Sequence, residues 1–195
     1  VHTGSALEYG VCSGDLAETT EARPTTLYGR TKLAGTLALQ QAALAYEMPA
    51  VTARLFTVYG PGERAGRLLP ALLAAAHSGE SLELTAGTQQ RDFTYVEDIA
   101  AGLLRLGKAV TAPGEVVNLA SGRLTSVRAF TEISAGVLGI PAGNLHFGAL
   151  PTRQEEMQHA PVATGKLQKL LGWLPTTTIQ QGVERTLQHE REGRC

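Results

Sequence analysis

Short β-prone segments alternate along this chain with longer segments of helical periodicity. The β-prone segments cover residues 1–5, 50–56, 81–85, 91–95, 116–119 and 144–147. The segments with helical character cover residues 26–47, 67–77, 96–108, 126–138, 164–171 and 179–190. Because strands that alternate with helices usually lie side by side and point the same way, the pattern predicts an α/β protein with parallel strand pairing.

The composition narrows the range of functions. The 195 residues carry a formal net charge of −1, which gives no electrostatic reason to expect a nucleic acid or an anionic membrane as partner. No apolar run reaches the roughly 20 residues that cross a bilayer, and the first five residues do not resemble a signal peptide. Cys12 and Cys195 lie near opposite ends and the five histidines are scattered, so we expect neither a disulfide framework nor a metal site. A cytoplasmic enzyme is the resulting expectation.

Tyr28 and Lys32 lie four residues apart in the predicted helix 26–47, which places a phenol and an ammonium group on one face. A nearby cation stabilises a phenolate, so it lowers the pKa of a tyrosine from its usual value of about 10. Ser5, at the carboxyl end of strand 1–5, is a candidate to hold the oxygen under reaction. Taken alone, the Tyr28/Lys32 pair fits equally a surface helix whose tyrosine packs and whose lysine is solvated.

Further motifs accompany this pair in a fixed order. They are Thr3-Gly4-Ser5 with Tyr9-Gly10, then Tyr28 with Lys32, Arg54-Leu55-Phe56 with Tyr59-Gly60-Pro61-Gly62, Arg91-Asp92-Phe93 with Tyr95-Val96 and Asp98, Arg153, and Lys166 through Leu171-Gly172-Trp173 to Gly182-Val183. Together they resemble the NAD-dependent epimerase/dehydratase family, which modifies nucleotide sugars and belongs to the extended short-chain dehydrogenase/reductase superfamily. The resemblance spans the whole chain.

The resemblance implies a fold. It is an NAD(P)-binding, Rossmann-like doubly wound sheet, of which the N-terminal βαβ half is missing here, joined to a small α/β substrate-binding region. Residues 1–62 would form the C-terminal part of the Rossmann-like domain. Residues 63–195 would mainly bind the nucleotide sugar, with residues 94–120 returning to the sheet.

The resemblance also implies catalytic roles. Ser5 matches the catalytic serine or threonine of the family, and Tyr28 matches the acid/base. Lys32 matches the residue that holds the nicotinamide ribose and tunes the tyrosine. The cofactor would be NAD or NADP, and the reaction a hydride exchange between a sugar carbon and the nicotinamide ring.

Other positions match substrate contacts of the family. Arg91 and Arg153 correspond to arginines that grip the nucleotide diphosphate, a role that suits the paired donors of a guanidinium. Arg67 and Leu68 begin a helix that supports the nucleotide. Asn118 lies where the family approaches its substrate, although an asparagine at the end of a strand is often structural.

Some positions depart from the family pattern. Ala6 and Leu7 replace the acidic pair that dehydratases carry after the catalytic residue, which argues against a 4,6-dehydratase. Glu8, in an extended segment, would point away from Leu7, so we assign it no acid/base role. Thr57 replaces an asparagine that contacts substrate phosphate, and phosphate binding is expected to differ there.

The family's glycine-rich turn, which cradles the cofactor pyrophosphate, is expected before residue 1. The residue that distinguishes NAD from NADP would also lie there. We therefore expect this chain alone to be inactive and to expose a strand edge.

Several alternatives stay open. The same catalytic set serves a 4-epimerase, which we favour, and a nucleotide 4-keto-sugar reductase. A non-catalytic nucleotide-sugar or dinucleotide binding protein, or an inactive fragment, is the alternative of another class. The helix bearing Tyr28 pairs across a homodimer in many family members. Its stripe of Leu33, Leu37 and Leu44 would serve such a contact or the core, and we expect the core.

Overall fold

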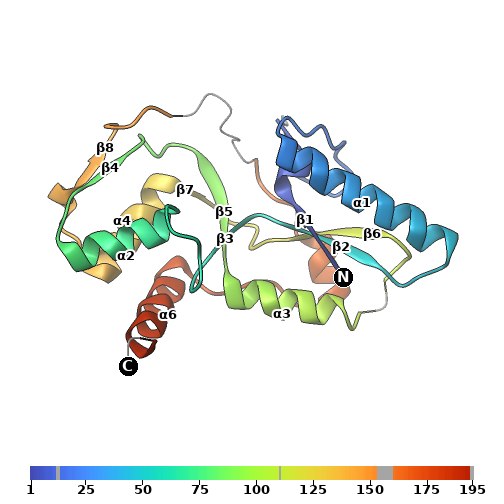
Figure 1. Ribbon diagram of the computed structural model, residues 1–195. Coiled ribbons are helices and arrows are strands. Elements are labelled where there is room, and N and C mark those ends of the chain that lie inside the picture. Colours follow the sequence, from blue (N-terminus) through green and yellow to red (C-terminus); the bar gives the residue numbers. More distant parts are fainter. Residues whose placement is uncertain (12–13, 110, 153–159, 194–195) are drawn as a thin grey trace.

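The structure is a computed structural model that describes residues 1–11, 14–109, 111–152 and 160–193. Figure 1 shows two lobes joined by long strands. We call one the sheet lobe; its strands and helices cover residues 2–5, 27–45, 51–55, 96–106, 115–119 and 165–171. We call the other the helical lobe; its elements cover residues 68–78, 82–84, 127–138, 145–147 and 179–192. Cys12, Arg153 and Cys195 lie outside the described residues.

The sheet lobe is built on three parallel strands. They are β1 (His2–Ser5), β2 (Val51–Leu55) and β6 (Glu115–Leu119), in the order β1-β2-β6. Ser5 pairs with Leu55, and Leu55 with Leu119, so the three strands end together at one edge. The predicted α/β class and parallel pairing are confirmed. Within the described ranges β1 pairs with β2 only.

Helices cover both faces of this sheet (Figure 1). The helix α1 (Leu27–Ala45) lies against β1 on one face. The helices α3 (Val96–Leu106) and α5 (Gly165–Leu171) cover the other face. The apolar core between the sheet and these two helices contains Val51, Ala53, Ile99, Leu106, Val117, Leu119 and Leu167. Alternate residues of β2 face this core because side chains of a strand alternate between faces.

Three strands connect the lobes. The strands β3 (Thr57–Tyr59) and β5 (Gln90–Tyr95) pair in parallel, and β7 (Leu124–Ser126) pairs antiparallel with β5. Against them pack α4 (Val127–Leu138) and α6 (Ile179–Glu192), and α2 (Leu68–Ser78) packs on α4. Aromatic rings fill this second core, where Phe93 and Phe130 stack with centroids 4.2 Å apart. The strands β4 (Leu82–Leu84) and β8 (Leu145–Phe147) pair at the outer end.

Helix positions agree closely with those predicted, and Ser126 caps α4 by accepting the amide hydrogen of Ala129. The sequence pattern missed β3 and β7, because three residues carry too little alternation to mark a strand. It also missed two 3₁₀ turns, η1 (Ala6–Glu8) and η2 (Ala142–Asn144). In the part of the chain that the structure describes, no helix is both long enough and apolar enough to span a membrane.

The expected burial of the leucine stripe on α1 is wrong. Leu37 is 49% exposed and Leu44 68% exposed, whereas Thr36 and Ala43 are buried. On the inward face, the Thr36 hydroxyl donates a hydrogen bond to Glu8, which lies inside the sheet lobe. The buried face thus contains a polar contact, which the periodicity of apolar residues could not reveal.

Candidate active site

Ser5 is the last residue of β1 and the N-cap of η1. Its Oγ accepts a hydrogen bond from the Leu7 amide at 3.2 Å, and its own amide donates to Glu8 Oε1 at 2.8 Å. These two bonds form a capping box, which fixes both the backbone and the side chain at the turn. Because Oγ accepts the Leu7 hydrogen, the hydroxyl proton of Ser5 is available for another acceptor.

Tyr28 and Lys32 lie on the first turns of α1, whose N-cap is Thr26. Tyr28 is 53% exposed. The Lys32 Nζ lies 5.7 Å from the centroid of the Tyr28 ring and donates a hydrogen bond to the Thr3 carbonyl at 3.0 Å. The phenol and the ammonium group therefore share one face of α1, and the lysine ties that face to β1.

A close approach of backbones places this face beside Ser5. Gly29 follows Tyr28, and a Cβ at Gly29 would collide with the carbonyl oxygen of Leu7 in η1. The absence of a side chain therefore lets α1 rest directly on the turn that carries Ser5. Ser5, Tyr28 and Lys32 thus lie on elements that contact each other at β1 and η1, near the carboxyl end of β1, where parallel sheets commonly place their ligands.

Glu8 occupies the interior behind this turn. The predicted extended geometry is wrong, because residues 6–8 form a 3₁₀ turn that directs the Glu8 side chain inward. The Glu8 carboxylate is fully buried and pairs with Arg54 of β2 at 2.9 Å. The Arg54 guanidinium lies 4.4 Å from the centroid of the Tyr9 ring. Motif spacing gave no sign of this pair, since its members are 46 residues apart.

Asn118 belongs to a structural network. It is completely buried, and its Oδ1 accepts a hydrogen bond from the Tyr9 hydroxyl at 2.7 Å. Its Nδ2 donates to the carbonyl oxygens of Leu16 at 2.9 Å and Ala163 at 3.3 Å. Burial raises the pKa of Tyr9, so the phenol stays protonated and donates. The amide is committed to the protein, and the geometry does not support the predicted contact with substrate.

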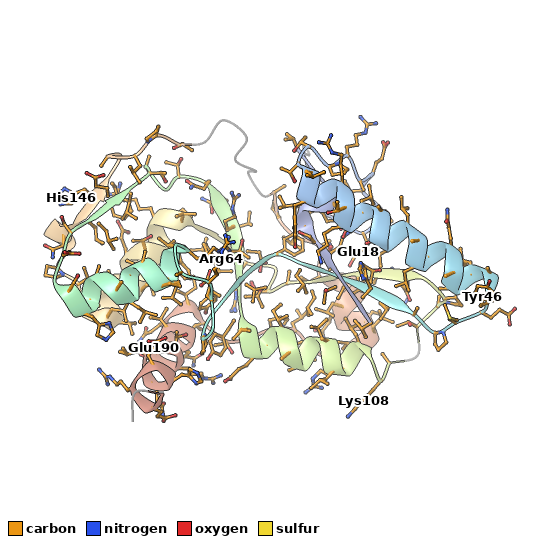
Figure 2. The ribbon with its side chains drawn as sticks, viewed as in Figure 1. Glu18, Tyr46, Arg64, Lys108, His146 and Glu190 are labelled. Atoms are coloured by element: carbon orange, nitrogen blue, oxygen red, sulfur yellow. The ribbon has the colours of Figure 1, made fainter. Side chains whose placement is uncertain are left out.

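The backbone of Asn118 is held as well. Its amide donates to Glu18 Oε1 at 2.9 Å, and Figure 2 shows Glu18 below α1, beside the sheet. The segment between η1 and α1 is thereby tied to the edge of the sheet where Ser5 lies.

Four of the predicted substrate residues line one pocket of about 560 Å³ in the helical lobe. They are Thr57, Arg67, Leu68 and Arg91. Arg64 lines it too and was not predicted, and Figure 2 shows this residue between the two lobes. Apolar lining comes from β4, β8 and α4, including Leu84, Phe147 and Phe130. Three guanidinium groups beside an apolar wall suit a ligand with an anionic part and a flat, less polar part.

Glu63 stands beside these arginines. Its Oε1 accepts a hydrogen bond from Arg67 Nε at 3.1 Å, and Oε2 is buried with no hydrogen-bond partner among the residues that the structure describes. Burial raises the pKa of Glu63, and the neighbouring Arg67 opposes that rise. The sequence carries no motif at this position, so the residue was missed.

The arrangement defines a class of protein. A serine, a tyrosine and a lysine near the carboxyl edge of a parallel sheet, with a pocket in a second lobe, are consistent with an extended short-chain dehydrogenase/reductase. The chain belongs to the NAD dependent epimerase/dehydratase family, whose model matches residues 1–120.

Relatives of known sequence and structure agree with this assignment. A probable UDP-glucuronate 4-epimerase from Rhizobium meliloti is 30% identical over 181 residues, which cover 83% of this chain and 52% of that protein. The crystal structure of UDP-glucuronic acid 4-epimerase from Bacillus cereus, in complex with UDP-glucuronic acid and NAD, is 27% identical. It superposes with a TM-score of 0.86 over 98% of this chain and 60% of that chain. The chain thus spans about half the length of the curated relatives it matches.

Proposed function

We propose that this chain forms the catalytic and nucleotide-sugar-binding part of an NAD(P)-dependent nucleotide-sugar 4-epimerase. The observation that carries the proposal is the placement of Ser5, Tyr28 and Lys32 at one edge of the parallel sheet. The names of the relatives, which include 4-epimerases for UDP-glucuronate and dTDP-L-rhamnose, support the choice of reaction.

The residues present fit the nicotinamide end of a dinucleotide. Lys32 uses one ammonium hydrogen for Thr3, which leaves two donors for ribose hydroxyls. The exposed Tyr28 ring stands beside it. When bound, the nicotinamide supplies reversible hydride transfer.

Side chains of this protein would take up and return the proton of the sugar hydroxyl. Tyr28 takes the proton of the sugar hydroxyl as that carbon is oxidised to a ketone, and returns it when the ketone is reduced from its other face. The Ser5 hydroxyl, whose oxygen already accepts the Leu7 amide, donates its hydrogen to the reacting oxygen.

The pocket of the helical lobe would hold the nucleoside diphosphate. Arg64, Arg67 and Arg91 offer guanidinium donors to phosphate oxygens, and the Thr57 hydroxyl offers a further one. Leu68 belongs to the apolar part of the wall. Arg153 stays a predicted phosphate ligand, outside the described residues. The division of the chain into functional regions at residue 62 also stays a prediction.

The test uses the intact protein that contains this chain, with UDP-glucose, UDP-galactose, UDP-glucuronic acid and dTDP-4-keto-6-deoxyglucose. Interconversion of 4-epimers without net change of cofactor absorbance is expected. Tyr28→Phe should lower kcat by about 10²–10⁴-fold, the usual contribution of a general acid/base. Steady consumption of NAD(P)H with the keto sugar would instead identify a reductase. Binding of the nucleotide sugars without turnover, unaltered in Tyr28→Phe, would identify a binding protein.

A further inference from the structure

A charged pair is buried directly behind the turn that carries Ser5. The Glu8 side chain is 0% exposed and that of Arg54 is 5% exposed, and Arg54 Nε lies 2.9 Å from Glu8 Oε2. Such a pair is costly to bury, and an apolar pair of similar volume commonly stabilises a protein equally well or better. Stability alone therefore does not account for these two residues.

The Glu8 carboxylate joins three elements of the site. Oε1 accepts the amide hydrogen of Ser5, at the end of β1. Oε2 accepts the hydroxyl hydrogen of Thr36 at 3.1 Å, from α1, and the Nε hydrogen of Arg54, from β2. One carboxylate thus connects the strand end that bears Ser5 with the helix that bears Tyr28 and Lys32.

The neighbouring residues hold the pair in a single geometry. A Cβ at Gly4 would lie 2.6 Å from Glu8 Oε1 and 2.8 Å from Thr52 Cγ2, so the strand leaves the carboxylate its space. On the other side, Arg54 lies over the Tyr9 ring, whose hydroxyl is fixed by Asn118. Neither charged side chain can move without displacing a strand, a ring or a buried amide.

We propose that Glu8 and Arg54 are positioning residues, which fix Ser5 relative to Tyr28 and Lys32 for proton and hydride transfer. The inference rests on the proposed function of that set. Neither residue touches substrate: Glu8 acts through the Ser5 amide and the Thr36 hydroxyl, and Arg54 acts by orienting Glu8. Displacement of a reacting group by about 1 Å can cost on the order of 100-fold in rate.

The decisive variant is the double substitution Glu8→Leu with Arg54→Met in the intact protein. It removes both charges together, so neither is left buried and unpaired. We expect a folded protein with a lowered melting temperature, because the buried Ser5 amide and Thr36 hydroxyl lose their acceptor. The KM for the nucleotide sugar should be unaltered, with kcat lowered about 10-fold or more. A folded double variant whose kcat stays within about twofold of the parent would overturn the proposal.

Thr36→Val is the second variant, because it cuts only the link from α1 to Glu8. Its matched control is Thr186→Val, another buried helical threonine, whose hydroxyl donates to Gly182 within α6. A fall in kcat in Thr36→Val alone supports the proposal, and equal kcat in both variants contradicts it. This pair decides the question if the double variant does not fold.

The activity of the parent protein distinguishes failure of the proposed function from failure of this inference. If the parent turns over none of the nucleotide sugars, the function is wrong, and positioning is then tested by hydrogen–deuterium exchange of residues 5–9 and 27–32. Faster exchange in both segments of a folded Glu8→Leu/Arg54→Met variant supports the positioning role. Exchange equal to that of the parent contradicts it.

Discussion

Glu63 is a carboxyl group whose partly buried environment disfavours the charged form. It pairs with Arg67, four residues later in the loop before α2, yet burial dominates and raises its pKa. A raised pKa means that the folded state binds the proton more tightly than the unfolded state does. The stabilising contribution of the protonated group is therefore present below pH 4.5, the ordinary value of its pKa, and is lost as pH rises through the folded pKa.

Glu63→Gln removes this titration. We expect the free energy of unfolding of the variant, relative to the parent, to rise between about pH 4 and pH 7, because only the parent then acquires a poorly solvated charge. Urea unfolding at several pH values measures it. The control is Glu132→Gln, whose glutamate pairs with Arg128 at the same spacing on an exposed helix surface. A relative stability of Glu63→Gln that is constant with pH would show the shift to be absent.

Asn118 illustrates a buried polar residue that matches a substrate position of the family but serves the fold. Asn118→Leu keeps the size and removes the hydrogen bonds that the Asn118 side chain makes with the Tyr9 hydroxyl and with the carbonyls of Leu16 and Ala163. A hydrogen bond contributes about 0.5–1.5 kcal/mol, so the loss of three should lower the free energy of unfolding by at least about 1 kcal/mol. Denaturant unfolding gives the loss. Unaltered stability with a raised KM would restore the substrate role.

At the scale of elements, the contact between α1 and η1 sets the position of the proposed catalytic residues Tyr28 and Lys32 relative to Ser5. Helix propensity favours alanine over glycine by about 1 kcal/mol, but a Cβ at Gly29 meets the Leu7 carbonyl and, at 3.0 Å, the Pro24 Cβ. Overpacking typically costs 1–3 kcal/mol, and a backbone oxygen cannot turn aside as a side chain can.

Gly29→Ala is therefore expected to lower the free energy of unfolding by about 1–3 kcal/mol and to lower kcat, since α1 must move away from Ser5. Thermal and urea unfolding, with kcat, measure both effects. Gly136→Ala in α4 is the matched control, because a Cβ placed there meets no described atom within 4 Å apart from its chain neighbours and the backbone of its own helix. It should be neutral or stabilising by up to about 1 kcal/mol. A Gly29→Ala variant as stable as this control would refute the close-contact argument.

At the scale of the molecule, α1 presents an apolar surface outward. Leu37 and Leu44 are seven residues apart, on one stripe, and both are exposed. Tyr46 is exposed at the end of this helix that lies far from the helical lobe (Figure 2). A surface of this kind fits a contact between two copies of the protein.

We expect Leu37→Gln with Leu44→Gln to convert a homodimer of the intact protein to a monomer, because the contact would lose its apolar centre. Light scattering coupled to size-exclusion chromatography measures the mass. Leu104→Gln, on an equally exposed leucine of α3, is the control and should leave the mass unaltered. A monomeric parent, or a double variant of unaltered mass, would reject a dimer through this face.

Local sequence determined most of the secondary structure and indicated the candidate reacting groups. Alternation of strands and helices was enough for the parallel α/β class, since that pattern depends on residues near one another in the chain. The four-residue spacing of Tyr28 and Lys32 likewise implied a shared helical face. Order and spacing of the motifs were sufficient to recognise the family.

Only the tertiary structure decided the surroundings of those groups. Several features join residues that are far apart in sequence: the Glu8–Arg54 ion pair, the hydrogen bond between Tyr9 and Asn118, and the pocket shared by Arg64, Arg67 and Arg91. The exposure of Leu37 depends on how the whole of α1 is rotated. Such contacts depend on which elements pack together and at what distance, and the local periodicity of the sequence predicts neither. Short motifs therefore indicate the chemical groups of the candidate site, and long-range packing determines their geometry.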